Sequence, residues 1–317
     1  MSPGHIKKVA FIDRVNPHLM DRLREKGVVC DDLSKLNSDE VFEKIPDYDG
    51  IVIRSKFPVN KAFLDRASSL KFIARSGAGM ENIDVDYASK KGVVLFNSPE
   101  GNRTAVAEHA VGMLLSLLNH LKKVDDEVRK GIWLRAENRG HELKGKTVAI
   151  IGYGNMGHSF AKRLQGFEVN VIAYDKYKKN YGDRFARETS WEEIYEKADV
   201  LSLHVPLAED TLYLINKERL SKFKKPIYLI NTARGKNVNI KDLLEAIEEG
   251  KVLGACLDVL EFEGTSFEAI DKENQVYQKL IQSDKVLLSP HIAGWTHESY
   301  FKLADFLFKK IEAHFLS

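Results

Sequence analysis

The sequence contains few of the features that mark metal-binding, secreted or membrane proteins. It has only two cysteines, Cys30 and Cys256, which lie in apolar, strand-like segments without the spacing of a metal site. The longest apolar stretch, residues 110–118, is far shorter than the roughly 20 residues that a transmembrane helix needs. The start, MSPGHIKKVAFID, lacks the apolar core of a signal peptide. We therefore predict a cytoplasmic protein with reduced thiols and no bound metal.

Net charge is also small. The 48 basic and 46 acidic side chains nearly cancel, and the formal net charge is +2. This balance creates no global field that would favour nucleic acid or a membrane surface as a partner. The chain has 317 residues, of which 44% are hydrophobic and 30% charged, an ordinary composition for about two globular domains.

Short apolar runs alternate with longer, helix-compatible segments along almost the whole chain. The first series of runs lies at residues 8–13, 27–30, 50–55, 70–76 and 93–98, and the second at 146–152, 169–175, 198–206, 227–235, 252–259 and 285–290. This βαβα rhythm predicts parallel sheets covered by helices on both faces. We expect an α/β fold of two doubly wound, Rossmann-like or flavodoxin-like domains separated by a cleft.

Two Ser-Pro pairs, Ser98-Pro99 and Ser289-Pro290, end strands at the predicted domain boundaries. Proline restricts its own backbone and that of the residue before it, so each pair stops its strand. We predict a discontinuous domain of residues 1–98 and 290–317 and a second domain of residues 99–289. The two crossings would then lie side by side as a hinge, with His291 next to it.

The segment between the two series, residues 103–131, is apolar nearly all round in its first half. Such a pattern predicts a buried helix, either between domains or at a subunit interface. We therefore expect a homodimer through this region. His109 lies inside the helix, and we interpret it as a structural histidine.

A glycine motif follows the first strand of the second series. VAIIGYGNMGHSF carries Gly152, Gly154 and Gly157 in G-x-G-x-x-G spacing, between a strand pattern and a helix pattern. Glycine lets the backbone turn tightly and approach a pyrophosphate, which the N-terminus of the next helix stabilises. The motif therefore predicts a dinucleotide site.

Asp175 ends the next strand and is placed to accept hydrogen bonds from the adenosine ribose. Its charge would repel a 2′-phosphate, which favours NAD over NADP. Lys176 and Lys178 lie close enough to weaken that preference.

Ligands of open α/β sheets bind beyond the carboxyl ends of the strands. In the second series these positions hold an arginine (Arg234), acidic residues between 258 and 263, and a histidine (His291). Together they form a set that can bind an oxo acid and move a proton while a hydride is transferred.

The motifs resemble those of the D-isomer-specific 2-hydroxyacid dehydrogenase family over essentially the whole chain. RSGAGMENIDVDYASKKGVVLFNSPEGN, AVAEHAVGMLLSL, GYGNMG, NTARG, LDVLEFE and SPHIAG follow in the family's order. The resemblance implies NAD as cofactor, a substrate domain in residues 1–98 and 290–317, and an NAD-binding Rossmann domain in 99–289. It implies that Arg234, Glu263 and His291 are catalytic. It implies that Arg54, Ser55, Ala78, Gly79 and Asn102 bind substrate. The implied cofactor residues are Gly152, Gly154, Asn155, Met156, Gly157, Asp175, His204, Pro206, Thr232, Ala233, Asp258 and Gly294.

The chemistry of a 2-oxo acid assigns a role to each catalytic residue. The guanidinium of Arg234 offers a planar pair of donors for the carboxylate and ketone. His291 can donate a proton to the ketone oxygen during reduction and accept it in the reverse reaction. Glu263 would orient the imidazole and favour its protonated form.

Three positions depart from the family pattern or leave the assignment open. Gly264 stands where the family usually has proline, and the polar segment TSFEAIDKENQ follows it. Glu261 is a second carboxylate near Glu263, and only the spacing from Asp258 selects Glu263. Trp295 replaces a small residue after HIAG, as either a pocket wall or a packing residue.

Cations near the predicted carboxylate site favour a phosphorylated substrate. Arg54-Ser55-Lys56 supplies two of them, and Arg135 and Arg139 add to the count, unless all are solvated surface residues. We predict 3-phosphoglycerate, and hence serine biosynthesis, without feedback by serine because no regulatory domain follows residue 317. Glycerate, glyoxylate, hydroxypyruvate and D-lactate remain alternatives.

Two related classes compete with this prediction. An NAD-sensing binding protein, like the C-terminal-binding transcriptional corepressors, shares the architecture, but this chain lacks their long tails. Formate dehydrogenases resemble the family with glutamine as the partner of the histidine, whereas this chain has Glu263.

Overall fold

The computed structural model describes residues 5–264 and 270–316. It divides the chain into two compact units, residues 1–102 with 295–317 (unit 1) and residues 103–294 (unit 2). The chain passes from one unit to the other after residues 102 and 294, a few residues later than the boundaries predicted from the Ser-Pro pairs. Pro99 begins helix α5 (Pro99–Leu118), as proline at a first helical position commonly does. Residues 291–293 stay with unit 2 because their amides bind Asp258.

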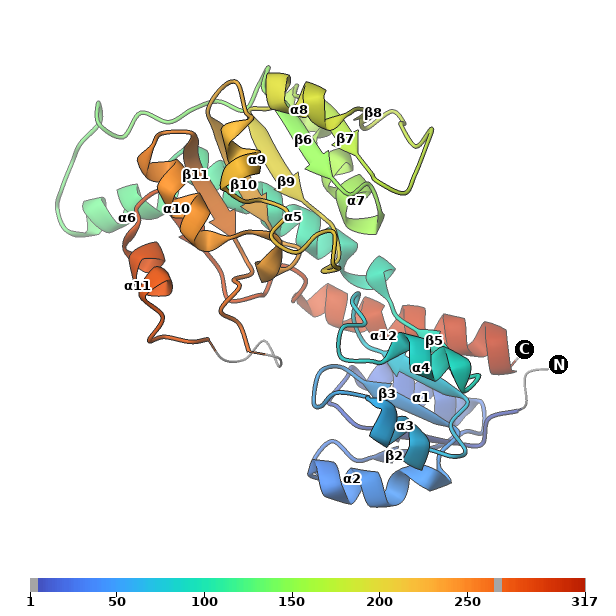
Figure 1. The fold of residues 1–317 in the computed structure, drawn as a ribbon. Helices are drawn as coiled ribbons and strands as arrows, with labels where there is room; N and C mark the ends of the chain where they lie inside the picture. Colours follow the sequence, from blue (N-terminus) through green and yellow to red (C-terminus); the bar gives the residue numbers. More distant parts are fainter. Residues whose placement is uncertain (1–4, 265–269, 317) are drawn as a thin grey trace. The chain divides into compact units, whose positions relative to one another are not determined.

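Unit 1 contains a five-stranded sheet in the order β2-β1-β3-β4-β5, with every pairing parallel (Figure 1). This is the flavodoxin-like strand order. The strands are β1 (Lys8–Phe11), β2 (Val29–Asp32), β3 (Gly50–Ile53), β4 (Phe72–Arg75) and β5 (Val94–Phe96). The helices are α1 (Pro17–Glu25), α2 (Ser38–Lys44), η1 (Ile45–Asp47), α3 (Lys61–Arg66), α4 (Val85–Lys90), α12 (His297–Ile311) and η4 (Glu312–Leu316).

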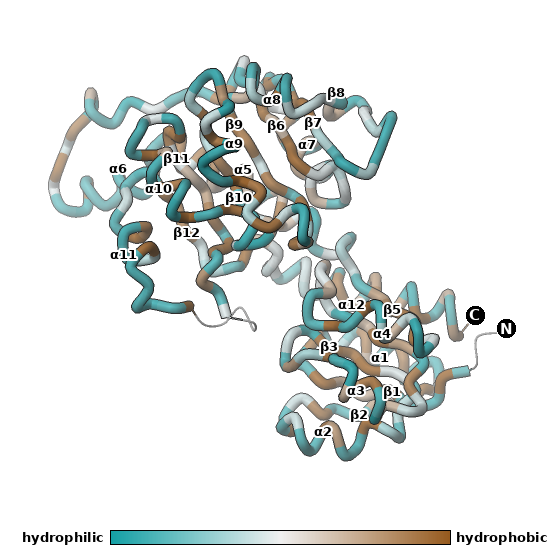
Figure 2. The backbone as a smooth tube through the Cα atoms, viewed as in Figure 1, coloured by the Kyte–Doolittle hydropathy of each residue, from teal (hydrophilic) through white to brown (hydrophobic). Residues whose placement is uncertain are grey.

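Successive side chains of a strand point to opposite faces of this sheet, and each face has its own hydrophobic core. Ala10 and Ile12 join one cluster with residues of α2, α3 and α4, whereas Val9 and Phe11 join another with residues of α1 and α12. Figure 2 shows the apolar strands in brown and the polar loops in teal. Burial on both faces explains why the strands read as continuous apolar runs.

Unit 2 contains a seven-stranded parallel sheet in the order β12-β11-β10-β9-β6-β7-β8. Counted from β6, this is the Rossmann order with one added strand. The strands are β6 (Thr147–Ile151), β7 (Asn170–Tyr174), β8 (Arg187–Glu188), β9 (Val200–Leu203), β10 (Ile227–Asn231), β11 (Val252–Leu257) and β12 (Val286–Leu288). The helices besides α5 are α6 (Leu121–Arg129), α7 (Asn155–Arg163), η2 (Leu164–Phe167), α8 (Trp191–Lys197), α9 (Lys217–Ser221), η3 (Gly235–Asn237), α10 (Ile240–Glu248) and α11 (Gln275–Gln282).

The two cores of unit 2 lie on opposite faces of its sheet. Helices α5 and α7 supply one, and α8, α9, α10 and α11 supply the other. The predicted class, two parallel-sheet α/β domains, is confirmed, and each predicted strand is present. Within the described residues, no helix is both long and apolar enough to cross a membrane. Residues 265–269 of the polar segment after Gly264 lie outside the described part of the chain.

The apolar helix predicted in residues 103–131 is α5, and unit 2 itself buries it. Ala107, Ala110, Leu114 and Leu118 are all fully buried in the α5–α7 core. His120 then adopts a left-handed backbone, with φ of 54°, and α6 starts in a new direction. Figure 1 shows α6 and the loop after it extending away from the sheet of unit 2.

Candidate active site

The glycine turn joins β6 to the nine-residue helix α7, and its three glycines serve different purposes. Gly152 has φ of +91°, and a Cβ there would lie 2.5 Å from the His204 carbonyl oxygen. A Cβ on Gly157 would lie 2.1 Å from the Gly152 carbonyl oxygen, so this glycine lets helix and turn touch. A Cβ on Gly154 would meet nothing within 4 Å. The fold thus requires the first and third glycines, and the second leaves open space where α7 begins.

This space suits the diphosphate of a dinucleotide. The first amides of α7, including those of Asn155 and Met156, have no acceptor within the helix, and the helix dipole attracts an anion. The turn also lies beside the end of β9, where strand order reverses between β6 and β9. Open α/β sheets bind ligands at such a reversal. The geometry therefore fits NAD.

Asp175 directly follows β7 and accepts three main-chain N–H groups. Its Oδ2 accepts from Tyr153 at 2.9 Å, and its Oδ1 accepts from Tyr177 at 3.0 Å and Lys178 at 3.2 Å. These bonds fix the carboxylate beside the glycine turn. A carboxylate has about four acceptor positions, two on each oxygen, so the carboxylate retains capacity for one further bond, on Oδ2.

The two lysines that could favour NADP are both bound to protein oxygens. Lys176 Nζ lies 2.6 Å from Asp210 Oδ2, and Lys178 Nζ donates to the Tyr153 carbonyl at 2.7 Å. Each ammonium group is therefore bound to a protein oxygen and keeps further donors, since an ammonium has three protons.

His204 contributes its main chain rather than its ring to this edge. Its Nε2 lies 2.8 Å from Ser202 Oγ, and the ring packs 5.2 Å from that of Phe160. Burial lowers the pKa of His204 to about 3, so the ring is neutral. The carbonyl of His204 instead faces Gly152.

Thr232, predicted to lie along the cofactor, has a buried hydroxyl with no hydrogen-bond partner among the described residues. Buried polar groups are nearly always paired, so such a hydroxyl suits a site that receives a polar ligand. Ala233 follows it and is buried, and Pro206 follows β9 in the neighbouring loop.

His291 and Glu263 are in direct contact. The Nδ1 of His291 lies 2.8 Å from Oε2 of Glu263, whose other oxygen accepts the Leu260 N–H. The side chains are 25% and 15% exposed, so the pair is largely withdrawn from water. Glu263 thereby fixes the orientation of the imidazole through Nδ1.

Glu261, the alternative carboxylate, points elsewhere. Its Oε1 accepts the Ile240 N–H at 2.9 Å, and its carboxylate also binds the hydroxyl of Tyr213. That hydrogen bond raises the pKa of Tyr213. Glu261 therefore holds the start of α10 and the Tyr213 turn.

Arg234 lies on the loop after β10, beside the loop that carries Glu263. A Cβ on the next residue, Gly235, would lie 2.1 Å from the carbonyl carbon of Leu260. The two loops therefore touch at main-chain distance, one residue from Arg234. Asn237 Oδ1 accepts the Arg234 N–H at 3.1 Å, and Arg234 Nη1 donates to the Ala233 carbonyl at 2.7 Å.

Asp258, predicted to contact the cofactor, uses its carboxylate to hold the loop of His291. Its side chain is 1% exposed and accepts N–H groups from Ile292 and Ala293, both at 2.9 Å. Ser289 Oγ also donates to it at 2.6 Å. Sequence reasoning missed this role, because no local pattern links residue 258 to residues 289–293. Gly294 ends the same loop.

In unit 1, Asp13 organises the predicted substrate loop after β3. Its Oδ2 accepts the N–H groups of Arg54 at 2.6 Å, Ser55 at 2.9 Å and Lys56 at 3.2 Å. The Arg54 guanidinium lies 4.7 Å from the ring centre of Trp295, a cation–π contact. Trp295 therefore packs on a predicted substrate residue.

Lys56 is not a second cation for a substrate. Its Nζ donates to the carbonyls of Ile12 at 3.2 Å, Leu33 at 3.3 Å and Ser34 at 2.8 Å. Three acceptors use all three ammonium protons. The expectation that Lys56 would help to bind a phosphate is therefore wrong.

The remaining predicted substrate residues lie on other segments of unit 1. Ala78 and Gly79 follow β4, and the Ala78 carbonyl accepts from Asn97 Nδ2 at 2.7 Å. Asn102 lies in the first turn of α5.

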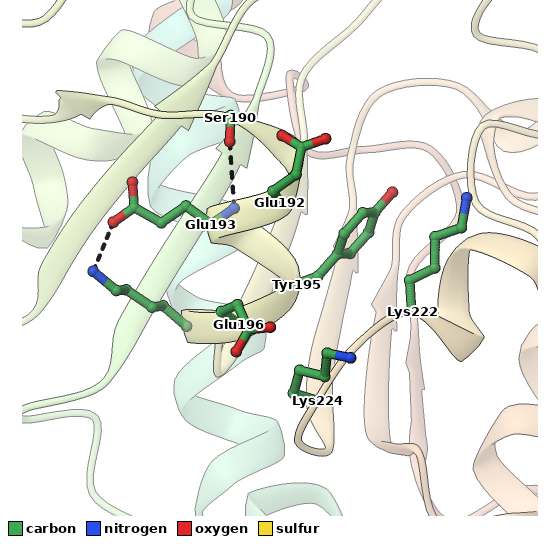
Figure 3. A pocket seen from close by; sticks show the side chains of 8 residues that line it. Ser190, Glu192, Glu193, Tyr195, Glu196, Lys222 and Lys224 are labelled. Atoms are coloured by element: carbon green, nitrogen blue, oxygen red, sulfur yellow. Dashed lines mark hydrogen bonds and ion pairs between the residues drawn. The ribbon is translucent and has the colours of Figure 1, made fainter.

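A surface hollow between α8 and the segment after α9 is unrelated to these residues (Figure 3). Glu193, on its wall, binds Arg187, Thr189 and Lys197, and Lys222 binds Glu218. Three acidic and three basic residues line it, and none of the predicted site residues does.

Comparison with known proteins identifies the family. The family model of the D-isomer specific 2-hydroxyacid dehydrogenase NAD-binding domain matches residues 111–293. The hydroxypyruvate reductase of Thermotoga maritima is 34% identical over 300 residues, 95% of this chain and 94% of that protein. The D-3-phosphoglycerate dehydrogenase of Archaeoglobus fulgidus is 34% identical over 294 residues, 92% of this chain. The match covers 54% of that relative, so the chain spans about half its length.

Among solved structures, the D-lactate dehydrogenase of Aquifex aeolicus, complexed with NAD and lactic acid, matches with a TM-score of 0.81. It is 29% identical, and the match covers 97% of this chain and 95% of that one. The resemblance predicted from the motifs is confirmed, as is NAD as the cofactor of this domain. The chain belongs to the D-isomer-specific 2-hydroxyacid dehydrogenase family, and residues 111–293 match its NAD-binding domain.

Proposed function

We propose that this protein interconverts a D-2-hydroxy acid and its 2-oxo acid with NAD. The observation that carries the proposal is the contact of 2.8 Å between His291 Nδ1 and Glu263 Oε2. A carboxylate on one imidazole nitrogen orients the ring for proton transfer, as an acid–base histidine requires.

Each catalytic residue has one role in this proposal. Arg234 binds the carboxylate of the oxo acid through its planar donors. His291 gives its Nε2 proton to the ketone oxygen during reduction and takes the hydroxyl proton during oxidation. Glu263 keeps His291 in position. Bound NAD would accept or supply the hydride.

The residues of the glycine turn and of the neighbouring strand ends would hold the cofactor. The amides at the start of α7 would bind its diphosphate, and Asp175 its adenosine ribose. Thr232 would satisfy its buried hydroxyl there. Arg54, Ser55, Ala78, Gly79 and Asn102 are the proposed substrate residues.

For the substrate we propose 3-phosphoglycerate first, and with it a place in serine biosynthesis. Arg54 supplies one cation in the predicted substrate loop, and several relatives are D-3-phosphoglycerate dehydrogenases. Hydroxypyruvate or glyoxylate is the second candidate, because Lys56 is committed to three carbonyls and cannot bind a phosphate. Relatives with those activities are also similar in sequence.

A substrate panel decides between these candidates. NADH absorbance is followed with phosphohydroxypyruvate, hydroxypyruvate, glyoxylate and pyruvate, and in reverse with D-3-phosphoglycerate. A higher kcat/KM for the phosphorylated acids supports the first candidate, and a preference for unphosphorylated ones supports the second. Absence of turnover with every acid would refute the dehydrogenase proposal.

We also propose a homodimer through the 103–131 region and the residues that follow it. Exposed apolar side chains gather there: Leu121, Val128, Ile132, Trp133 and Leu134. Trp133 is 75% exposed, and a patch of this kind commonly marks a protein interface. A monomer in sedimentation equilibrium would refute the dimer. A cytoplasmic location remains a proposal, and it is consistent with the two free, buried cysteines.

A further inference from the structure

We propose that His109 is a positioning residue for His291, acting through Ser289 and Asp258. The inference rests on the proposed function for what His291 does. It goes beyond that function by assigning a role in the active site to a histidine of α5.

The backbone of His291 needs outside support. Its φ is 54°, in the left-handed region that residues with a side chain seldom adopt. Asp258 holds this segment with both its main-chain carbonyl and its side-chain carboxylate. Its carbonyl accepts the His291 N–H at 2.7 Å, and its carboxylate accepts the next two N–H groups, of Ile292 and Ala293. Any movement of Asp258 would therefore be transmitted to His291.

Asp258 in turn depends on Ser289. The carboxylate is 1% exposed, and the Ser289 hydroxyl donates to its Oδ1 at 2.6 Å. Met113 Sδ, at 3.7 Å, is a much weaker acceptor for the same proton. Since a hydroxyl has one proton, Ser289 Oγ can only accept a bond from any further partner.

That further partner is His109. Its Nε2 lies 2.9 Å from Ser289 Oγ and 3.7 Å from Asp258 Oδ1. Because the serine proton goes to Asp258, Nε2 of His109 must carry the donated proton. The three side chains thus form one directed chain of hydrogen bonds that ends on the His291 loop.

The series of hydrogen bonds starts from His109 on helix α5, which is firmly packed. Helix α5, which carries His109, is anchored by Ala107, Ala110 and Leu114, all fully buried in the core of unit 2. A helix packed in this way holds the imidazole of His109 in a fixed place. The donor therefore fixes the Ser289 hydroxyl, which in turn fixes Asp258 and the left-handed turn at His291.

The test compares two variants of His109. His109→Gln keeps an N–H donor of similar reach, whereas His109→Leu removes it at similar size. We expect His109→Leu to lower kcat by about tenfold, because small displacements of a catalytic group are costly. We expect His109→Gln to restore most of that loss. The KM for NADH should change little in both, and Met113→Leu, which changes packing on the same helix, should match wild type.

An NMR readout makes the test independent of turnover. The His291 imidazole resonance of the full-length protein should shift in His109→Leu and Ser289→Ala, and stay near its wild-type position in His109→Gln and Met113→Leu. Equal loss of kcat in His109→Leu and His109→Gln, or an unmoved His291 resonance in His109→Leu, would overturn the proposal. If His109→Leu does not fold, Ser289→Ala decides by the same resonance. If no 2-oxo acid is reduced by the wild type, the proposed function fails while this resonance still tests the positioning role.

Discussion

His291 and Glu263 form an imidazole–carboxylate pair with Nδ1 and Oε2 2.8 Å apart. Glu261, two residues before Glu263, binds the Ile240 N–H instead. Two glutamates on one short loop therefore have different tasks: one orients the candidate acid–base residue, and the other anchors a helix. This separation makes them a matched pair for mutation.

Glu263→Gln should lower kcat by about 10- to 100-fold. The substitution removes the charge from a hydrogen bond to His291, and such bonds contribute about 1.5–3 kcal/mol. Glu261→Gln should keep kcat near wild type and lower the urea midpoint of unfolding, because it weakens the anchor of α10. Steady-state kinetics and urea unfolding of both variants check this, and equal kcat losses would contradict the assignment.

Asp175→Asn should weaken NAD binding and reduce the preference for NAD over NADP by about tenfold. The amide keeps an oxygen for the Tyr153 N–H but loses the charge that repels a 2′-phosphate. Calorimetric titration with both cofactors measures the ratio. A variant with unchanged preference would refute the ribose assignment.

Two glycines of the turn should respond differently to substitution by alanine. Gly157→Ala should destabilise the protein by about 1–3 kcal/mol, because the new methyl would lie 2.1 Å from the Gly152 carbonyl oxygen. Gly154→Ala should leave stability near wild type and weaken NADH binding, since its Cβ meets only open space at the start of α7.

Gly112→Ala, inside α5 and with nothing within 4 Å, is the control and should gain about 0.5–1 kcal/mol. Urea unfolding and NADH fluorescence titration check all three glycine variants. NADH binding unchanged in Gly154→Ala would argue against a diphosphate at this position.

The neutral ring of His204 should make stability fall in mild acid. Its pKa is about 3 in the folded protein against 6.5 for a solvated histidine. Between these values the unfolded chain binds the proton and the folded chain does not, so stability decreases as pH falls through the window. From pH 7 to pH 5 this amounts to about 2 kcal/mol. His204→Gln should lose this part of the pH dependence in urea unfolding, and an identical dependence in both proteins would contradict it.

The strands could be predicted from the sequence because burial on both sheet faces leaves continuous apolar runs, as in β9 and β10. β8 was missed because its two residues, Arg187 and Glu188, are exposed and carry no apolar pattern. The start of α6 could not be predicted either, since the chain turns at His120 without a glycine or proline.

For the site, strand ends and family motifs selected the residues, but side-chain partners could not be predicted. Lys56 binds carbonyls of residues 12, 33 and 34, and Asp258 binds amides of residues 292 and 293. Such partners are distant along the chain and meet only once it folds. The partners of Lys176 and Lys178, the two lysines near Asp175, could not be predicted either, and both lysines bind protein oxygens.

The most direct test of the central claim measures His291→Ala for both turnover and NADH binding. The claim is that His291 exchanges a proton with the substrate, so its loss should lower kcat by about 10²- to 10⁴-fold. NADH affinity, measured by fluorescence titration, should stay close to wild type. A variant that reduces the best 2-oxo acid at the wild-type rate would contradict the account.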